Sequence, residues 1–207
     1  MRIAVLFFGR LTKSIEQYTN ILDSIGREHT LDIFFSSDNA PDSLVQECVQ
    51  LYSPVAYNNT AITYTGVLEQ YVENIDGVQV GNMIRHFINK YRVYSLLEHH
   101  IEHTNTQYDC VLSIRFDLAF GHAIPFLNIN ENTVYIPSGA DWLGGINDQL
   151  AYGDVPSMKK YMNMWLNTEE ILDKGLSRIH AESITSANIT YTGLQVVRFD
   201  LSYDIRR

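Results

Sequence analysis

Long apolar runs, cysteine and net positive charge are all scarce in this sequence, and each scarcity excludes a class of protein. The apolar run that opens the chain, Ile3–Phe8, is far shorter than the roughly 20 residues of a membrane-spanning helix. It is also shorter than the core of a signal peptide. Two cysteines, Cys48 and Cys110, form neither a disulfide framework nor a metal-type spacing. We therefore expect a soluble, intracellular protein with no membrane span.

The charge balance argues against a nucleic-acid partner. The formal net charge is −9, with 24 acidic residues against 15 lysines and arginines. Phosphate backbones require a clustered basic surface, which this composition does not favour. A single anionic ligand can still bind in a locally basic pocket.

The remaining pattern is that of one α/β domain. The chain has 207 residues, of which 45% are hydrophobic, enough for one packed core. Expected strands cover Ile3–Phe8, Leu31–Phe35, Val55–Tyr57, Tyr108–Ile114 and Val134–Ile136, with one more after Ile189, and expected helices cover residues 15–25, 43–51, 82–103 and 146–166. Residues 58–81 are expected to form a loop. Strands alternating with helices predict a Rossmann-like, mostly parallel sheet flanked by helices.

The segment VLSIRFDLAF carries the first candidate site. A buried strand ends in Arg115-Phe116-Asp117, and ligands of open α/β sheets bind at that edge. Alternation places Arg115 and Asp117 on one side of the chain. Asp117 offers oxygen to Mg²⁺ or Mn²⁺, and Arg115 offers forked donors to a phosphate. The alternative is a plain ion pair at the end of a strand.

Two other strand ends should meet the same edge. Gly9-Arg10 closes the first strand, where glycine permits close approach and Arg10 can contact phosphate. This turn is not a GxGxxG loop, so a dinucleotide-binding domain has little support. Ser37-Asp38 follows the second strand and is expected at the same edge, as a candidate for nucleotide binding; the alternative role of Asp38 is a helix or turn cap.

The long helix offers two further patterns. Arg85, Asn89 and Arg92 share one face, which either supplies cations to a diphosphate, with Arg85 the best candidate, or is solvated. The run of histidines at His99, His100 and His103 is better explained as a solvent-exposed helix end than as a metal site.

The loop GADWLGGINDQ carries the second candidate site. Its polar and aromatic residues are Asp141, Trp142, Asn147, Asp148 and Gln149. Sugars are bound by planar amides and carboxylates together with an aromatic platform, and Asp148 can serve as a base or an electrostatic stabiliser. In the alternative interpretation, Asn147 or Asp148 caps a helix and Trp142 lies in the core.

These motifs resemble those of GT-A glycosyltransferases. VLSIRFDLAF resembles their Asp-x-Asp metal motif, with Arg115 in place of the first Asp, and Phe8-Gly9-Arg10 resembles the opening of a branch of small enzymes. His180-Ala181-Glu182 resembles a His-Pro-Glu element of that branch; the alternative is a turn of a surface helix. The resemblance implies a Mn²⁺ or Mg²⁺ cofactor held by Asp117 and His180. It also implies catalysis by Asp148 with Asp141, and contacts to the sugar and acceptor from Trp142, Asn147, Gln149 and Glu182.

The resemblance extends over nearly the whole chain to the N-terminal domain of multidomain glycosyltransferases of large chlorella viruses. It implies one GT-A domain over residues 1–207, with the nucleotide mainly on 1–120 and the donor sugar and acceptor mainly on 121–207. The donor would be a UDP-sugar carrying glucose, or a deoxyhexose such as rhamnose, and the acceptor a glycan or glycoprotein. Retention of configuration, further domains and a host-cytoplasmic location are implied as well. A non-catalytic nucleotide- or glycan-binding module is the alternative.

Overall fold

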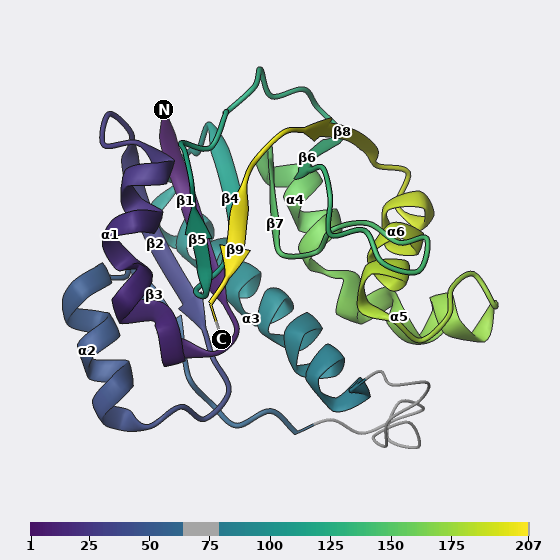
Figure 1. Cartoon of the computed structure of the whole chain (residues 1–207), viewed down its shortest axis with the longest axis horizontal. Coiled ribbons are helices and arrows are strands. Elements are labelled where there is room, and N and C mark those ends of the chain that lie inside the picture. The colour runs from purple at the N-terminus through teal and green to yellow at the C-terminus, as the bar shows by residue number, and fades with distance from the viewer. Residues whose placement is uncertain (64–78, 207) are drawn as a thin grey trace.

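Seven strands form the central sheet of the computed structural model, which describes residues 1–63 and 79–206 (Figure 1). In spatial order these are β3 (Ala56–Asn58), β2 (Thr30–Ser36), β1 (Arg2–Phe8), β4 (Cys110–Arg115), β7 (Leu150–Gly153), β6 (Thr133–Pro137) and β8 (Gln195–Phe199). All neighbours are parallel except that β7 runs antiparallel to both β4 and β6. A separate pair of strands, β5 (Leu118–Phe120) and β9 (Tyr203–Ile205), joins the end of the chain to its middle.

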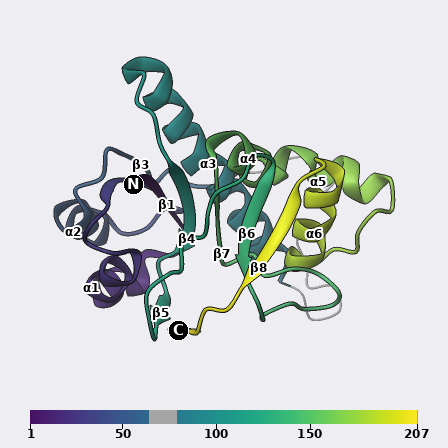
Figure 2. The same ribbon diagram turned by 90° about the horizontal axis from the view of Figure 1, so that it is seen from above.

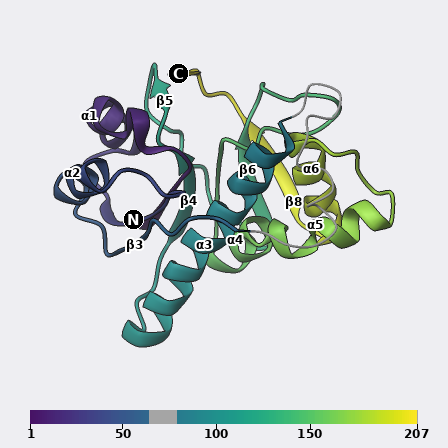
Figure 3. The same cartoon turned by 90° about the horizontal axis from the view of Figure 1, so that it is seen from below.

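Helices cover both faces of this sheet. They are α1 (Ser14–Ile25), α2 (Asp42–Tyr52), α3 (Val80–Thr104), α4 (Val155–Met162), α5 (Met164–Asp173) and α6 (Ala181–Tyr191), with a 3-10 turn, η1, at Leu11–Lys13. Figures 2 and 3 show α1 and α2 on one side of the sheet and α3 and α4 on the other. The central strands β1 and β4 are buried on both faces, as the compact apolar runs predict.

Alternate residues of each strand therefore enter two different cores. In β1, Leu6 and Phe8 pack toward α3, α4 and α6, whereas Val5 and Phe7 pack toward α1 and α2. Cys48 and Cys110 are free thiols, both buried. No helix in the described ranges is long and apolar enough to cross a membrane.

The structure confirms most of the expected elements. The five predicted strands and the late strand correspond to β1, β2, β3, β4, β6 and β8, and the first three predicted helices correspond to α1, α2 and α3. The predicted loop over residues 58–81 lies mostly outside the described residues.

The helix expected over residues 146–166 is confirmed only in its second half, by α4 and the start of α5, and is wrong before Asp154. Leu150–Gly153 is instead the antiparallel strand β7, buried throughout because it pairs on both sides. A helix, α4, begins only after Asp154, whose side chain accepts a hydrogen bond of 2.8 Å from the Ser157 amide. The apolar spacing fits a helix locally, but pairing between β4 and β6 overrides that preference.

A close backbone contact fixes the loop that precedes β7. The amide of Ile146 donates to the carbonyl of Glu182 on α6 at 3.0 Å. A Cβ added at Gly145 would lie 2.2 Å from the carbonyl carbon of Glu182 and 2.4 Å from the amide nitrogen of Ser183. Only glycine lets this loop rest against the first turn of α6.

Gly145→Ala is expected to lower the free energy of unfolding by about 1–3 kcal/mol, the usual cost of overpacking, because the clashing atoms are backbone and cannot rotate away. Urea denaturation measures the change. Gly121→Ala is the matched control: its added Cβ would meet nothing closer than 3.8 Å, so its effect should stay within about 0.5 kcal/mol. A Gly145→Ala protein as stable as wild type would show that the loop does not rest on α6 in solution.

Candidate functional site

An open cleft of about 1040 Å³ lies at the edge where β4 ends, in the position expected for an α/β ligand site. Four segments far apart in the sequence line it: the start of α3, the loop 138–143, the start of α6 and the segment around β9. Arg115, Asp148 and Gln149 also line the cleft. The volume is at the upper end of the range for small-molecule and cofactor sites, about 300–1,000 Å³.

Asp148 is the most unusual group of this cleft. Its side chain is buried, and its Oδ2 lies 3.1 Å from Nε2 of His86 on α3. That ring nitrogen makes no well-aligned hydrogen bond within the described residues, so the contact is mainly electrostatic. Burial opposes ionisation of Asp148, but His86, Lys90 and Arg115 outweigh it and hold the pKa of Asp148 well below its ordinary value.

His86 is the partly buried partner of Asp148 in this cluster. Burial lowers its pKa, and the nearby charge of Asp148 offsets that effect only in part. The ring also packs edge-on against Phe8 at the end of β1, with ring centroids 4.9 Å apart. His86 is thus coupled to Asp148, and together with Lys90 and Arg115 it favours the ionised carboxylate.

Lys90 lies fully buried one helical turn after His86. Its ammonium donates to the backbone carbonyl of Asp148 at 2.7 Å and to the hydroxyl of Tyr161 at 3.2 Å. It also lies over the rings of Phe8 and Tyr161, at 5.0 and 4.8 Å from their centroids. Burial lowers the pKa of Lys90 to about 8, despite the opposing charge of Asp148. The cluster around Asp148 thus contains a buried ammonium group, outside the lining of the cleft, with a pKa of about 8.

Arg115 and Asp117 form a direct ion pair. Nε and Nη2 of Arg115 donate to the two carboxylate oxygens of Asp117 at 2.8 and 2.5 Å. β4 ends at Arg115 and Asp117 lies in the turn that follows, so the pair forms across this turn rather than along a continuing strand, and it is the ion pair considered as the alternative. Arg115 lines the cleft, and Asp117 is not among the lining residues. The forked geometry leaves Asp117 no oxygen free of Arg115.

Glu182 and His180 meet at the start of α6. Nδ1 of His180 lies 3.0 Å from Oε2 of Glu182, and both residues line the cleft. Burial and the charge of Asp148 raise the pKa of Glu182 to about 7. Burial also lowers the pKa of His180. The cleft therefore holds two carboxylic groups with opposite shifts, Asp148 ionised and Glu182 poised near neutral pH.

Asp141 and Asn147 brace the loop from outside the lining of the cleft. Asp141 forms an ion pair of 3.0 Å with Arg198 of β8 and accepts a hydrogen bond of 2.8 Å from the Asn147 amide. The Asn147 side chain donates to the Tyr203 hydroxyl at 2.6 Å. Gln149 is buried along the cleft, and its Oε1 has no hydrogen-bond partner among the described residues.

Trp142 lies on the surface at the rim of the cleft. Its side chain is 62% exposed, which excludes the core position considered above. An exposed indole beside a polar cleft can provide a platform for the apolar face of a sugar.

The remaining candidates gather beside the cleft rather than in its lining. Asp38 forms an ion pair of 2.9 Å with Arg85, and Ser37 donates to Asn59 at 2.6 Å. Gly9 has φ of +104°, a conformation that favours glycine, and Arg10 after it contacts the Asn82 side chain at 3.4 Å.

The face of α3 that contains Arg85 is not a solvated stripe. Asn89 is buried and accepts a hydrogen bond from Ser36 at 2.8 Å, while Arg92 donates to the backbone carbonyl of Thr60 at 2.6 Å. This face therefore anchors the segment after β3.

The sequence does not single out three residues of the cleft and its surroundings: His86, which lines the cleft, Lys90, which donates to the Asp148 carbonyl, and Tyr203, which also lines the cleft. The sequence does contain a signal for His86 and Lys90. They lie four residues apart on a helix whose neighbouring positions, such as Phe87 and Tyr94, are apolar. Polar groups on a buried helical face require partners. Tyr203 lies in a charged tail that carries no such pattern.

No known protein family matches the chain, and no curated protein matches its sequence.

Lys90→Met should reveal the buried lysine through the pH dependence of stability. Lys90 releases its proton near pH 8 in the folded protein but near its ordinary value of 10.5 when unfolded. Between these values the unfolded chain binds more protons, so wild-type stability gains with rising pH, by at most roughly 1.4 kcal/mol per pH unit. The variant lacks this gain.

We therefore expect the stability difference, wild type minus Lys90→Met, to increase by roughly 1–2 kcal/mol between about pH 8 and about pH 9.5. Urea denaturation of both proteins at each pH measures this difference. A difference that stays constant with pH would mean that Lys90 keeps an ordinary, solvated ammonium group.

Proposed function

We propose that the chain is a GT-A glycosyltransferase that binds a UDP-sugar in the cleft and transfers its hexose or deoxyhexose to a glycan or glycoprotein. The observation that carries the proposal is the convergence of Arg115, Asp148 and Glu182 in one cleft at the end of β4. The resemblance of VLSIRFDLAF and GINDQ to transferase motifs supports the same assignment. The α/β sheet is compatible with it.

The positive groups of the cleft suit a diphosphate. Arg115 lines the cleft and offers guanidinium N–H groups. The first turns of α3 and α6 also line it, and the start of a helix presents unpaired N–H groups and partial positive charge. Arg10 lies next to the first turn of α3 through Asn82. We assign the UDP diphosphate to this group of donors.

The two carboxylic groups take different roles in the proposed transfer. The bond between the anomeric carbon and the UDP oxygen breaks, and a bond to an acceptor hydroxyl forms. Asp148, ionised and preorganised, stabilises positive charge that develops on the sugar. Glu182, with its pKa near 7, accepts the proton of the attacking hydroxyl. Trp142 at the rim binds the sugar or the acceptor. Retention of configuration stays a prediction.

The residues expected to hold a divalent cation do not form one site. Both oxygens of Asp117 are occupied by Arg115, and Asp117 lies outside the lining of the cleft, whereas His180 lies within it. A metal at Asp117 would first have to displace the guanidinium. Dependence on Mn²⁺ or Mg²⁺ therefore stays a prediction from the resemblance, and no step above relies on it.

The Arg115–Asp117 pair also favours a second candidate function. A guanidinium that occupies the metal-motif carboxylate is compatible with a non-catalytic module that binds nucleotide or glycan. Such a module would bind UDP without releasing it from any UDP-sugar.

Glu182→Gln tests the proposed chemistry. UDP release from UDP-glucose or a UDP-deoxyhexose, with acceptor and with or without Mn²⁺, should increase in wild type as pH rises through about 7, because Glu182 must be ionised to accept a proton. The variant should lose that pH dependence and about 100-fold or more of the rate. Glu131→Gln, at an exposed position, should behave as wild type.

Three outcomes contradict the proposal at different points. An active Glu182→Gln protein with the wild-type pH profile removes Glu182 from the reaction. UDP binding without turnover of any UDP-sugar supports the non-catalytic module. Absence of both binding and turnover contradicts a nucleotide-sugar site altogether.

A further inference from the structure

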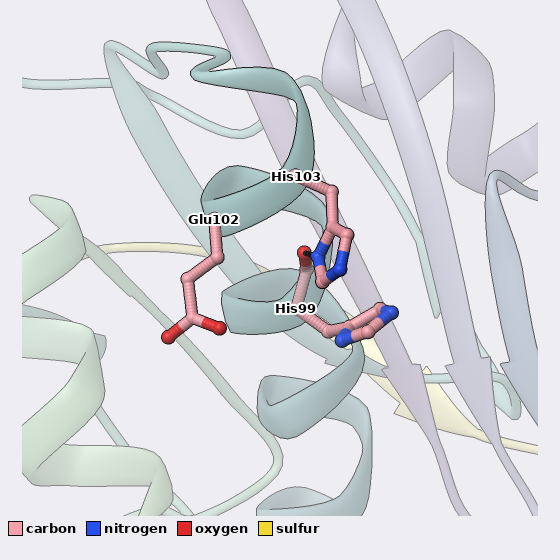
Figure 4. A group of neighbouring side chains, drawn as sticks. All are labelled: His99, Glu102 and His103. Carbon is pink, nitrogen blue, oxygen red and sulfur yellow. Dashed lines mark hydrogen bonds between the residues drawn. The ribbon is translucent and has the colours of Figure 1, made fainter.

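The far end of α3 carries three exposed side chains with metal-binding groups, His99, Glu102 and His103 (Figure 4). Residues three and four apart lie on one face of a helix. One potential ligand atom from each of the three side chains lies within 4.8 Å of the others. The sequence alone favours a solvated helix end here; the spatial convergence of three ligands gives reason to revise that interpretation.

The two imidazoles are already arranged as metal ligands require. Their ring centroids lie 3.9 Å apart. Nδ1 of His103 lies 2.7 Å from the carbonyl oxygen of His99, and because a carbonyl only accepts, Nδ1 carries the proton in this contact. Nε2 of His103 then offers its lone pair. Metal-binding histidines typically donate their second nitrogen to a carbonyl or carboxylate in this way.

The electrostatic environment favours a cation. The helix ends at Thr104, and the C-terminal end of a helix concentrates partial negative charge. Glu102 adds a carboxylate on the same turn. This end of α3 projects from the rest of the molecule, as Figures 2 and 3 show. Its first residue, His99, lies about 20 Å along the helix from His86, which lines the cleft, at about 1.5 Å per residue.

We propose that His99, Glu102 and His103 form a surface site for a transition-metal dication of the Zn²⁺, Ni²⁺ or Cu²⁺ class. Imidazole nitrogen suits these metals, whereas Mg²⁺ and Ca²⁺ prefer oxygen ligands. Ligands of tetrahedral zinc lie about 3.3 Å apart for bonds of about 2.0–2.1 Å. The side chains are exposed, so rotation can close the remaining distance, and water completes the coordination.

The bound ion would join side chains on successive turns of α3. Because it binds the folded helix end and not the frayed one, it stabilises the last turn by mass action. The site is independent of the proposed transferase function.

Calorimetric titration of ZnCl₂ into tag-free, EDTA-treated protein tests the site. Wild type should bind zinc saturably, and His103→Gln should weaken that binding about tenfold or more, since even the hydrogen-bond partners of metal ligands contribute about 10- to 100-fold. The control is His122→Gln, which alters another exposed histidine and should bind as wild type. His103 is exposed, so the variant should fold, and circular dichroism verifies this.

Histidine NMR spectra distinguish this site from the cleft. Zinc at the proposed site should shift the imidazole resonances of His99 and His103 first. Absence of saturable binding, equal affinity in wild type and His103→Gln, or first shifts at His180 would each overturn the proposal.

Discussion

One buried negative charge organises this molecule: the carboxylate of Asp148. It lies in the cleft floor among His86, Lys90 and Arg115, which hold it ionised against the cost of burial. An unpaired charge in such a place would be strongly destabilising, so each partner must be held in position by the fold. The carboxyl end of β4, the middle of α3 and the loop before β7 therefore have to meet at one point.

The same charge sets the chemistry of its neighbours. It keeps the pKa of Lys90 from falling further, and it adds to burial, the larger cause, in raising the pKa of Glu182 to about 7. Two carboxylic groups in one cleft thus acquire different protonation states, as acid–base chemistry requires. A core designed only for stability would gain by replacing these groups with apolar side chains of equal volume. We infer that the charged groups around Asp148 serve ligand binding or chemistry in the cleft rather than stability.

The sequence predicts the sheet well because its strands are compact apolar runs, such as Ile3–Phe8, whose burial on two faces leaves little ambiguity. It also places Arg115 and Asp117 at the carboxyl end of a strand, whereas Asp148, expected at the start of a helix, lies just before β7. The local sequence pattern predicts a helix at Leu150–Gly153, and this prediction fails. The segment is a strand because β4 and β6 pair with it on its two sides.

The sequence predicts where the site lies better than it predicts which side chains contact one another there. No pattern near Asp148 in the sequence indicates that its partners come from α3. Lys90, for example, lies 58 residues before it. Likewise, the two-residue spacing of Arg115 and Asp117 predicts a shared side but not that the guanidinium occupies both oxygens. Such pairings depend on tertiary packing.

The coupling between Asp148 and Glu182 is the most direct test of this account. Carbon-13 NMR can follow the Glu182 carboxyl during a pH titration of wild type and of Asp148→Asn, which keeps the size of the side chain and removes its charge. The account predicts a Glu182 pKa of about 7 in wild type and a lower value in the variant. An ordinary Glu182 pKa in wild type, or one that Asp148→Asn leaves unchanged, would contradict it.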